Sequence, residues 1–136
     1  MDEQKEMRVI MKPWGKELWF ALQDEYVGKI LYIKKGHRYS LQYHEHKKET
    51  QYVLKGQVKF YLGEDENNLK EVILGPGEKL DIYPGTIHRA EGVDDVEILE
   101  VSTNHLDDVV KLSDDYGRSG KGNNLTLDAE LSKTQI

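Results

Sequence analysis

The sequence predicts an all-β fold, a single barrel of short strands closed around one hydrophobic core. Its 136 residues leave room for one domain and no second independent core. Strand signals dominate between residues 17 and 101, where short segments are rich in β-branched and aromatic side chains. Gly, Pro, Asn and Asp separate these segments at short intervals, as is typical of a barrel or sandwich. Closing the barrel also leaves no exposed sheet edge.

Six segments have strand length rather than helix length, and a turn signal follows each of the first five. The segments cover residues 29–33, 51–54, 57–62, 71–74, 80–83 and 96–101. The turn formers lie at residues 35–36, 55–56, 63–68, 75–77, 84–85 and 92–95. This regular spacing argues for strands that pair with their neighbours rather than for a helical bundle.

One segment predicts a short C-terminal helix, residues 105–112, which follows the last expected strand. Thr103 or Asn104 would cap its first turn, because their side-chain oxygens can accept hydrogen bonds from free backbone N–H groups. The acidic residues of that turn would suit the positive end of the helix dipole. We therefore expect an all-β domain that ends in this helix.

A linker-like stretch follows Arg118, because residues 119–124 are rich in Gly and Asn. The remaining residues show only weak amphipathic character. We expect a barrel domain over residues 1–118 and a flexible or partner-docking tail over residues 119–136.

The overall composition excludes several classes of protein. The formal net charge of −6 argues against nucleic acid as a partner, because such proteins gather Lys and Arg on one face. No apolar run approaches the 18 or so residues of a membrane span, and the charged N-terminus does not look like a secretory signal. The chain has no cysteine, so a metal ion would need nitrogen and oxygen ligands. These features suit a cytoplasmic protein.

The first motif lies between Gly36 and Gly56 and contains Gln42, His44 and Glu49. Its spacing resembles the first motif of the cupins, a family of small β-barrels. In that family the positions of Gln42 and His44 are usually both histidine. Here an amide oxygen therefore stands where the first imidazole is expected.

The second motif starts at Gly77, continues through Tyr83-Pro84-Gly85 and ends at His88. It resembles the second cupin motif with the proline displaced by one position, and Gly92 stands where an Asn is usual. The resemblance implies a cupin double-stranded β-helix, also called a jelly-roll barrel.

Four side chains are the candidate metal ligands: Gln42, His44, Glu49 and His88. Residues 42 and 44 are two apart, so on a strand they project from the same face. Glu49 would start the next strand, and a barrel would bring His88 opposite. A catalytic metal needs such a set of ligands with an open coordination position. Zinc is our first expectation, and iron, manganese, cobalt and nickel also accept these ligands.

His46 is the alternative ligand. It shares the strand parity of Gln42 and His44, and His44-x-His46 would be a familiar ligand pair. The glycine spacing favours Gln42, whereas a bulge or a slipped strand would favour His46.

A closer resemblance covers roughly residues 9–118. This segment is similar to the C-terminal domain of type II mannose-6-phosphate isomerase. The segments that carry it are Lys12-Pro13-Trp14-Gly15, Gly36 through His44, and Glu100-Val101 through Asp114-Asp115-Tyr116-Gly117-Arg118. In that family an arginine usually stands at the position of Lys12. The guanylyltransferase domain that often accompanies this domain is not in the sequence, so the resemblance implies a stand-alone isomerase.

The resemblance implies an aldose-ketose isomerisation of mannose 6-phosphate to fructose 6-phosphate through an enediol. The metal would stabilise the negative charge of the enediolate. Glu100, His105 and Lys79 are the candidates for the catalytic proton carrier, and the spacing selects none of them.

The phosphate of the sugar needs a cationic partner, and arginine can bind phosphate with its planar fork. Arg38 and Arg89 lie beside the ligand segments, and Lys12 and Arg118 are further candidates for substrate binding. Each could instead pair with a surface carboxylate.

Two other functions remain open at this point. Histidines and a carboxylate can hold iron for a dioxygenase, and the barrel could also be a non-catalytic module that binds sugar phosphates. Because cupins commonly pair their barrels, we also expect a homodimer.

Overall fold

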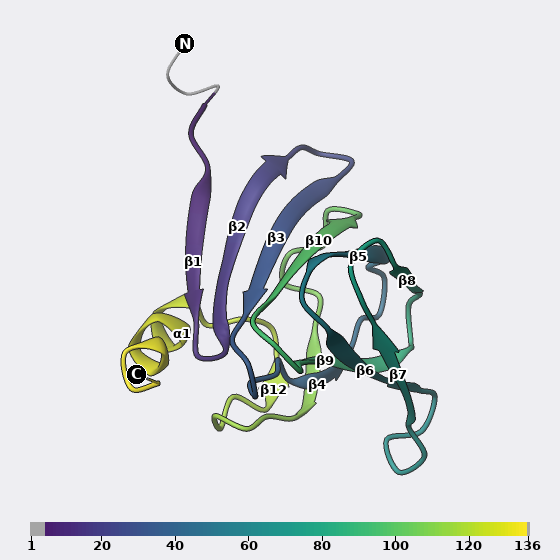
Figure 1. The fold of residues 1–136 in the computed structure, drawn as a ribbon. Helices are drawn as coiled ribbons and strands as arrows, with labels where there is room; N and C mark the ends of the chain where they lie inside the picture. The colour runs from purple at the N-terminus through teal and green to yellow at the C-terminus, as the bar shows by residue number, and fades with distance from the viewer. Residues whose placement is uncertain (1–4, 136) are drawn as a thin grey trace.

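The computed structural model describes residues 5–135 and consists of two antiparallel six-stranded sheets and one short helix (Figure 1). The first sheet has the order β1 (Arg8–Lys12), β2 (Gly15–Leu22), β3 (Val27–Ile33), β10 (Val96–Ser102), β5 (Glu49–Lys55) and β8 (Lys79–Ile82). The second has the order β12 (Gly120–Lys121), β11 (Val110–Ser113), β4 (Leu41–Tyr43), β9 (Ile87–Gly92), β6 (Val58–Gly63) and β7 (Lys70–Leu74). The helix, α1 (Leu125–Ser132), follows β12.

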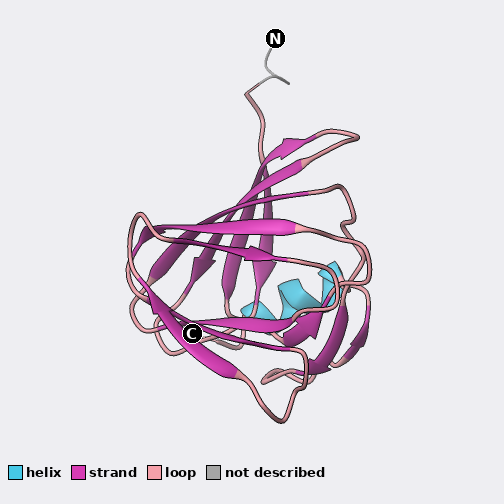
Figure 2. Ribbon diagram, turned by 90° about the vertical axis from the view of Figure 1, so that its right-hand side faces the viewer, coloured by secondary structure: helices cyan, strands magenta, loops and turns pink. Residues whose placement is uncertain are grey.

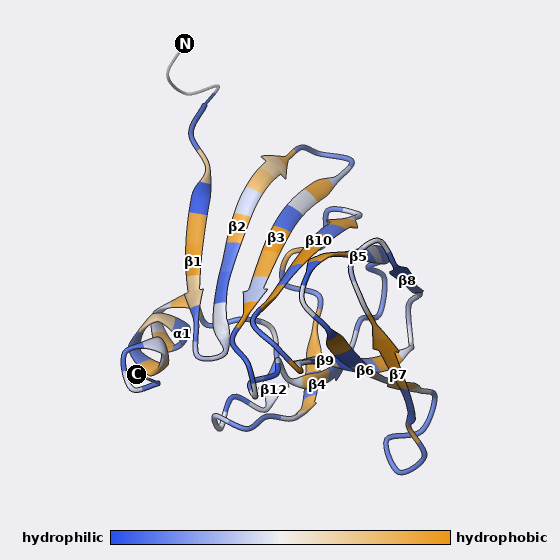
Figure 3. Cartoon of the chain, viewed as in Figure 1, coloured by the Kyte–Doolittle hydropathy of each residue, from blue (hydrophilic) through white to orange (hydrophobic). Residues whose placement is uncertain are grey.

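The predicted all-β architecture is confirmed, and each of the six expected strands overlaps one in the structure. The two sheets lie face to face and enclose the interior (Figure 2). Hydrophilic and hydrophobic residues alternate along β2 and β3, and the loop between β6 and β7 is hydrophilic (Figure 3). This alternation sends one set of side chains inward and the other toward solvent.

The interior of the barrel changes from apolar to polar along the strands. Directly opposed residues on neighbouring strands face the same side of a sheet. One inward row across β3, β10 and β5 is Leu31, Ile98 and Val53, and the next row is Lys29, Glu100 and Gln51. The apolar half holds the main core, which includes Phe60 at 0% exposure. A site for a polar ligand therefore lies at the other end of the same barrel.

The predicted helix over residues 105–112 is wrong, because these residues form a turn and the start of β11. The Asp108 carboxylate accepts hydrogen bonds from the backbone N–H groups of Glu45, His46 and Lys47. Lys111 pairs with Gln42 in β4. These tertiary contacts replace the local helix, although the acidic pattern favoured one. The C-terminal helix of the expected fold exists, but it lies at Leu125–Ser132.

Residues 119–136 were expected to be a flexible or partner-docking tail. In the structure, β12 pairs with β11, and α1 packs against β1 (Figure 1). Asp128 of α1 is fully buried and bonds to Lys12 at 2.7 Å. Within residues 5–135, no helix has the length and apolar character needed to cross a membrane.

Candidate metal centre

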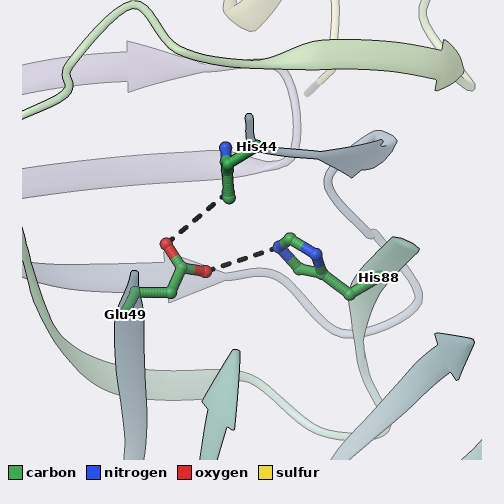
Figure 4. Close-up of side chains that lie close together, drawn as sticks. All are labelled: His44, Glu49 and His88. Atoms are coloured by element: carbon green, nitrogen blue, oxygen red, sulfur yellow. Dashed lines mark ion pairs between the residues drawn. The ribbon is translucent and has the colours of Figure 1, made fainter. Parts of the chain in front are cut away.

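Three of the predicted ligands converge in the polar half of the barrel (Figure 4). His44 follows β4, Glu49 begins β5 and His88 lies in β9. Glu49 Oε2 lies 3.6 Å from His44 Nε2, and Glu49 Oε1 lies 3.4 Å from His88 Nε2. One potential ligand atom from each residue lies within 4.8 Å of those of the other two. All three side chains are buried, so they form one enclosed group of donors.

The backbone orients both imidazole rings toward this centre. His44 Nδ1 donates to the carbonyl oxygen of Asp108 at 2.6 Å, and His88 Nδ1 donates to that of Thr86 at 2.9 Å. With the proton on Nδ1, each neutral ring keeps a lone pair on Nε2. Both Nε2 atoms are buried without a hydrogen-bond partner among the described residues. A histidine that ligates a metal has this arrangement, in which one nitrogen binds the ion and the other donates.

Lys47 and His88 keep Glu49 ionised, and burial keeps His44 neutral. Burial alone would raise the pKa of Glu49. Lys47 and His88 outweigh this effect and hold the pKa well below its usual value. Burial lowers the pKa of His44 to about 4, although Glu49 opposes this shift. Lys47 Nζ lies 2.9 Å from Glu49 Oε2, an ion pair that lacks the angles of a directed hydrogen bond. An ionised carboxylate and a neutral imidazole are the protonation states that bind a divalent cation.

Gln42 lies near this group, and His46 lies outside it. Gln42 is directly opposite His88 in the pairing of β4 with β9, so both side chains face the interior. Its Oε1 accepts from Ser40 at 3.3 Å. His46 is exposed, and its ring lies 6.1 Å from the ring of His105. The geometry therefore favours Gln42 over His46 as the fourth ligand.

A cavity of about 60 Å³ adjoins the centre, with His44 and Gln42 in its wall. Its other charged lining residues are Lys12, Glu17, Lys29, Lys47, Glu100, Asp108, Lys111 and Arg118, together with His105. Pockets for small molecules usually measure roughly 300–1,000 Å³. This cavity is strongly polar, and a ligand larger than a few water molecules would require part of its wall to move.

The four predicted substrate-binding residues fall into two places. Lys12 and Arg118 line the cavity. Arg89 follows His88 directly in β9, so its side chain leaves the other face of the strand, where Nε donates to the carbonyl of Tyr39. Arg38 forms an ion pair with Asp115 at 2.7 Å. Neither Arg38 nor Arg89 lines the cavity, and for Arg89 this follows from strand alternation.

The three candidate proton carriers also differ in position. Glu100 is buried in the cavity wall, where burial and the nearby Glu49 raise its pKa. His105 is exposed and lines the cavity, bonded to Thr103. Lys79 is exposed on β8 and bonds to Asp81 at 2.7 Å, outside the cavity. The structure thus brings Glu100 and His105 to the site and leaves Lys79 on the surface.

Sequence reasoning missed two lysines of the site. Lys47 is not among the candidate residues of the first motif, but it is 8% exposed and pairs with Glu49 and Glu100. Its position two residues before Glu49 could have shown that both face inward. Lys111 was assigned to the helix that does not form. Only the pairing of β11 with β4 reveals that it faces the interior.

Glu17 should make the stability of the fold sensitive to acid. Burial alone would raise the pKa of Glu17. The charges of Lys29 and Lys12 outweigh this effect and lower the pKa to about 2. Because this pKa lies below the ordinary 4.5, ionised Glu17 stabilises the fold above that pH, and the effect is lost as the pH falls toward 2. We expect Glu17→Gln to lose about 3 kcal/mol at neutral pH and much less near pH 2. Urea unfolding at both pH values measures this, and an equal loss at both would contradict it.

Comparison with known proteins connects the chain to enzymes of mannose metabolism. The family model described as "Mannose-6-phosphate isomerase C-terminal" matches residues 1–114. Mannose-1-phosphate guanylyltransferase of Escherichia coli K12 is 31% identical over 85% of this chain and 24% of its own length. Xanthan biosynthesis protein XanB of Xanthomonas campestris is 28% identical over 82% of the chain and 24% of its own length. The chain thus spans about a quarter of these relatives.

Solved structures support the predicted cupin jelly roll. The nucleoside dehydratase Pac13 superimposes with a TM-score of 0.67 at 17% identity, over 81% of this chain and 88% of that one. Oxalate decarboxylase of Bacillus subtilis superimposes with a TM-score of 0.68 at 15% identity, over 79% of this chain and 31% of that one. At these identities the likeness shows the fold. By their names, the guanylyltransferase, the dehydratase and the decarboxylase are enzymes.

The predicted conversion of mannose 6-phosphate to fructose 6-phosphate is contradicted by the relatives. The curated proteins that match are named for guanylyltransfer or xanthan biosynthesis, and none of those compared is named an isomerase. They extend far beyond the part that this chain matches. The two alternatives, a dioxygenase and a non-catalytic module that binds sugar phosphates, gain no better support from the comparisons.

Proposed function

Since the chain belongs to the mannose-6-phosphate isomerase C-terminal family, we propose that it is a metal-dependent cupin domain. Its centre holds one divalent ion through His44, Glu49 and His88, with Gln42 as the fourth ligand. The adjoining cavity receives a phosphorylated sugar, the class of compound in the names of the guanylyltransferase relatives.

The observation that carries this proposal is the pair of unpartnered imidazole nitrogens. His44 Nε2 and His88 Nε2 are buried and face one carboxylate, while their Nδ1 atoms are already bonded to backbone carbonyls. Buried polar atoms normally have hydrogen-bond partners. A cation between the two rings and Glu49 would satisfy both atoms at once.

Zinc is the first candidate for the ion. Two imidazoles, a carboxylate and an amide oxygen form a donor set without sulfur, and zinc accepts nitrogen and oxygen ligands in tetrahedral sites. Iron and manganese are the next candidates, because they also accept this mixture. When bound, such an ion polarises oxygen atoms of a ligand as a Lewis acid.

The protein groups around the centre have separable roles. Lys47 pairs with both Glu49 and Glu100, so it balances the negative charge of two buried carboxylates. Gln51 donates to Glu49 and to Glu100 and orients both. Burial raises the pKa of Glu100, so its carboxylate would accept a proton from a hydroxyl group of the sugar.

Elemental analysis of the full chain, purified without added metal, tests the proposal. We expect close to one equivalent of a divalent ion, zinc first, and loss of that ion on treatment with a chelator. Calorimetry with mannose 1-phosphate should then show binding to the metal-loaded protein and at least about tenfold weaker binding after stripping. A protein that takes up no zinc, iron or manganese would contradict the metal centre. Equal binding with and without metal would contradict its part in holding the sugar.

A further inference from the structure

Three buried cations gather in the wall of the cavity. Lys12 ends β1, Lys111 lies in β11 and Arg118 follows β11 in the chain. Their exposures are 5%, 7% and 7%, and all three line the 60 Å³ cavity. Cations are seldom this buried unless each is paired with an anion.

The anions in contact with this cluster are fewer than the cations. Asp128 binds Lys12 at 2.7 Å and Arg118 at 3.1 Å, and Asp114 binds Arg118 at 2.7 Å. Among the residues that the structure describes, none places a carboxylate in ion-pair contact with Lys111 or accepts a hydrogen bond from its ammonium. Glu17 lies 4.0 Å from Lys12 but only 3.3 Å from Lys29. The cluster of Lys12, Lys111 and Arg118 thus carries one positive charge more than Asp114 and Asp128 balance.

Lys111 faces the interior of the barrel next to the candidate metal ligands. It is directly opposite Gln42 in the sheet, and Gln42 is directly opposite His88. These three side chains therefore form one inward row. Burial lowers the pKa of Lys111, and the charge of Arg118 lowers it further, as expected for an ammonium without its own counter-ion.

Lys111 and Arg118 also line a second cavity, of about 370 Å³, beneath α1. Asn124, Leu127 and Asp128 of the helix segment also line this cavity. The two cavities thus share a cationic wall. Asp128 lines the second cavity and bonds to Lys12 and Arg118, which line the first, so it lies where the two cavities meet the same cations.

The fully buried anchor of α1 is one carboxylate, that of Asp128. The leucines of the helix, Leu125, Leu127 and Leu131, are only half-buried. The segment before it contains Gly120 and Gly122. A helix normally docks through an apolar face, so an anchor made of ion pairs is open to competition by another anion.

We infer that Lys12, Lys111 and Arg118 form a binding subsite for the phosphate group of the ligand, and that Asp128 occupies this subsite until phosphate displaces it. The inference deepens the proposed function, because the same ligand would reach the metal centre along the row of Lys111, Gln42 and His88. The C-terminal helix then acts as a lid whose own carboxylate stands in for the ligand. Phosphate is the better partner for three cations, because it offers more acceptor oxygens and more negative charge than a carboxylate.

Calorimetric titration of the full chain with inorganic phosphate, at constant ionic strength set with sodium chloride, tests this subsite without requiring a metal. We expect Asp128→Asn to bind phosphate at least about tenfold more tightly than the unmodified chain, because the competing carboxylate is gone. Lys111→Met should bind it at least about tenfold more weakly. Lys111→Met should also melt at a higher temperature, because it removes a buried charge that has no partner.

Glu130→Gln is the matched control, since it removes one negative charge from the exposed side of the same helix. Its phosphate affinity should stay within about twofold of the unmodified chain. Equal affinities for Asp128→Asn and Glu130→Gln would overturn the inference, as would unchanged affinity in Lys111→Met. If Asp128→Asn fails to fold, the phosphate affinity of Lys111→Met by itself decides whether the subsite exists. Zinc uptake measured in the same samples separates a failure of this subsite from a failure of the metal centre.

Discussion

Replacing His88 by alanine is expected to reduce the divalent metal content of the purified protein to background. His88 is 0% exposed and supplies one of the two imidazole nitrogens that residues 5–135 bring to the centre. Its removal leaves a single imidazole, Glu49 and a neutral amide. Changes to the outer partners of a metal site cost roughly 10–100-fold in affinity, so loss of a direct ligand should cost at least about 100-fold. Elemental analysis and competition with a zinc-sensitive dye measure both occupancy and affinity.

His46→Ala is the matched control for this experiment. His46 lies two residues after His44, but its side chain is exposed and contacts His105 instead of the centre. We expect this variant to keep full occupancy. Glu49→Gln should behave like His88→Ala, because it preserves the shape of the side chain and removes its charge. Full occupancy in His88→Ala, or loss of metal in His46→Ala, would show that the ligands are assigned to the wrong residues.

Replacing Gly56 by alanine is expected to destabilise the fold by about 3 kcal/mol or more. Gly56 has a φ of +78°, and a Cβ there would lie 2.5 Å from the carbonyl oxygen of Asp95. The variant would combine an unfavourable backbone conformation with a clash against backbone that cannot easily move. Because Gly56 joins β5 and β6, the strain would act on both sheets. Urea unfolding measures the loss of free energy.

Gly77→Ala separates these two effects. Gly77 has a similar φ of +88°, but a Cβ there would meet no atom within 4 Å. Its cost should be limited to the backbone conformation, about 1 kcal/mol. Equal losses in the two variants would show that the contact with Asp95 does not matter.

The sequence predicted the strands of the barrel well, because their signal is local. Segments such as residues 96–101 alternate inward and outward side chains, and a glycine-rich turn precedes or follows most of them. The acidic residues at 107–108 led to the wrong prediction of a helix over residues 105–112. Their carboxylates bond to backbone groups far away in the chain, and no local pattern carries that information.

By itself, the sequence determined the barrel, because strand alternation and turns depend on near neighbours in the chain. Its resemblance to the two cupin motifs singled out Gln42, His44, Glu49 and His88. The tertiary structure decided which charges surround them. It buried Lys47 beside Glu49, turned Arg89 away from the cavity, and placed Lys111 in the same inward row as Gln42. Which strand lies beside which depends on how the two sheets close around the core, and that closure sets the register and the partners of every buried charge.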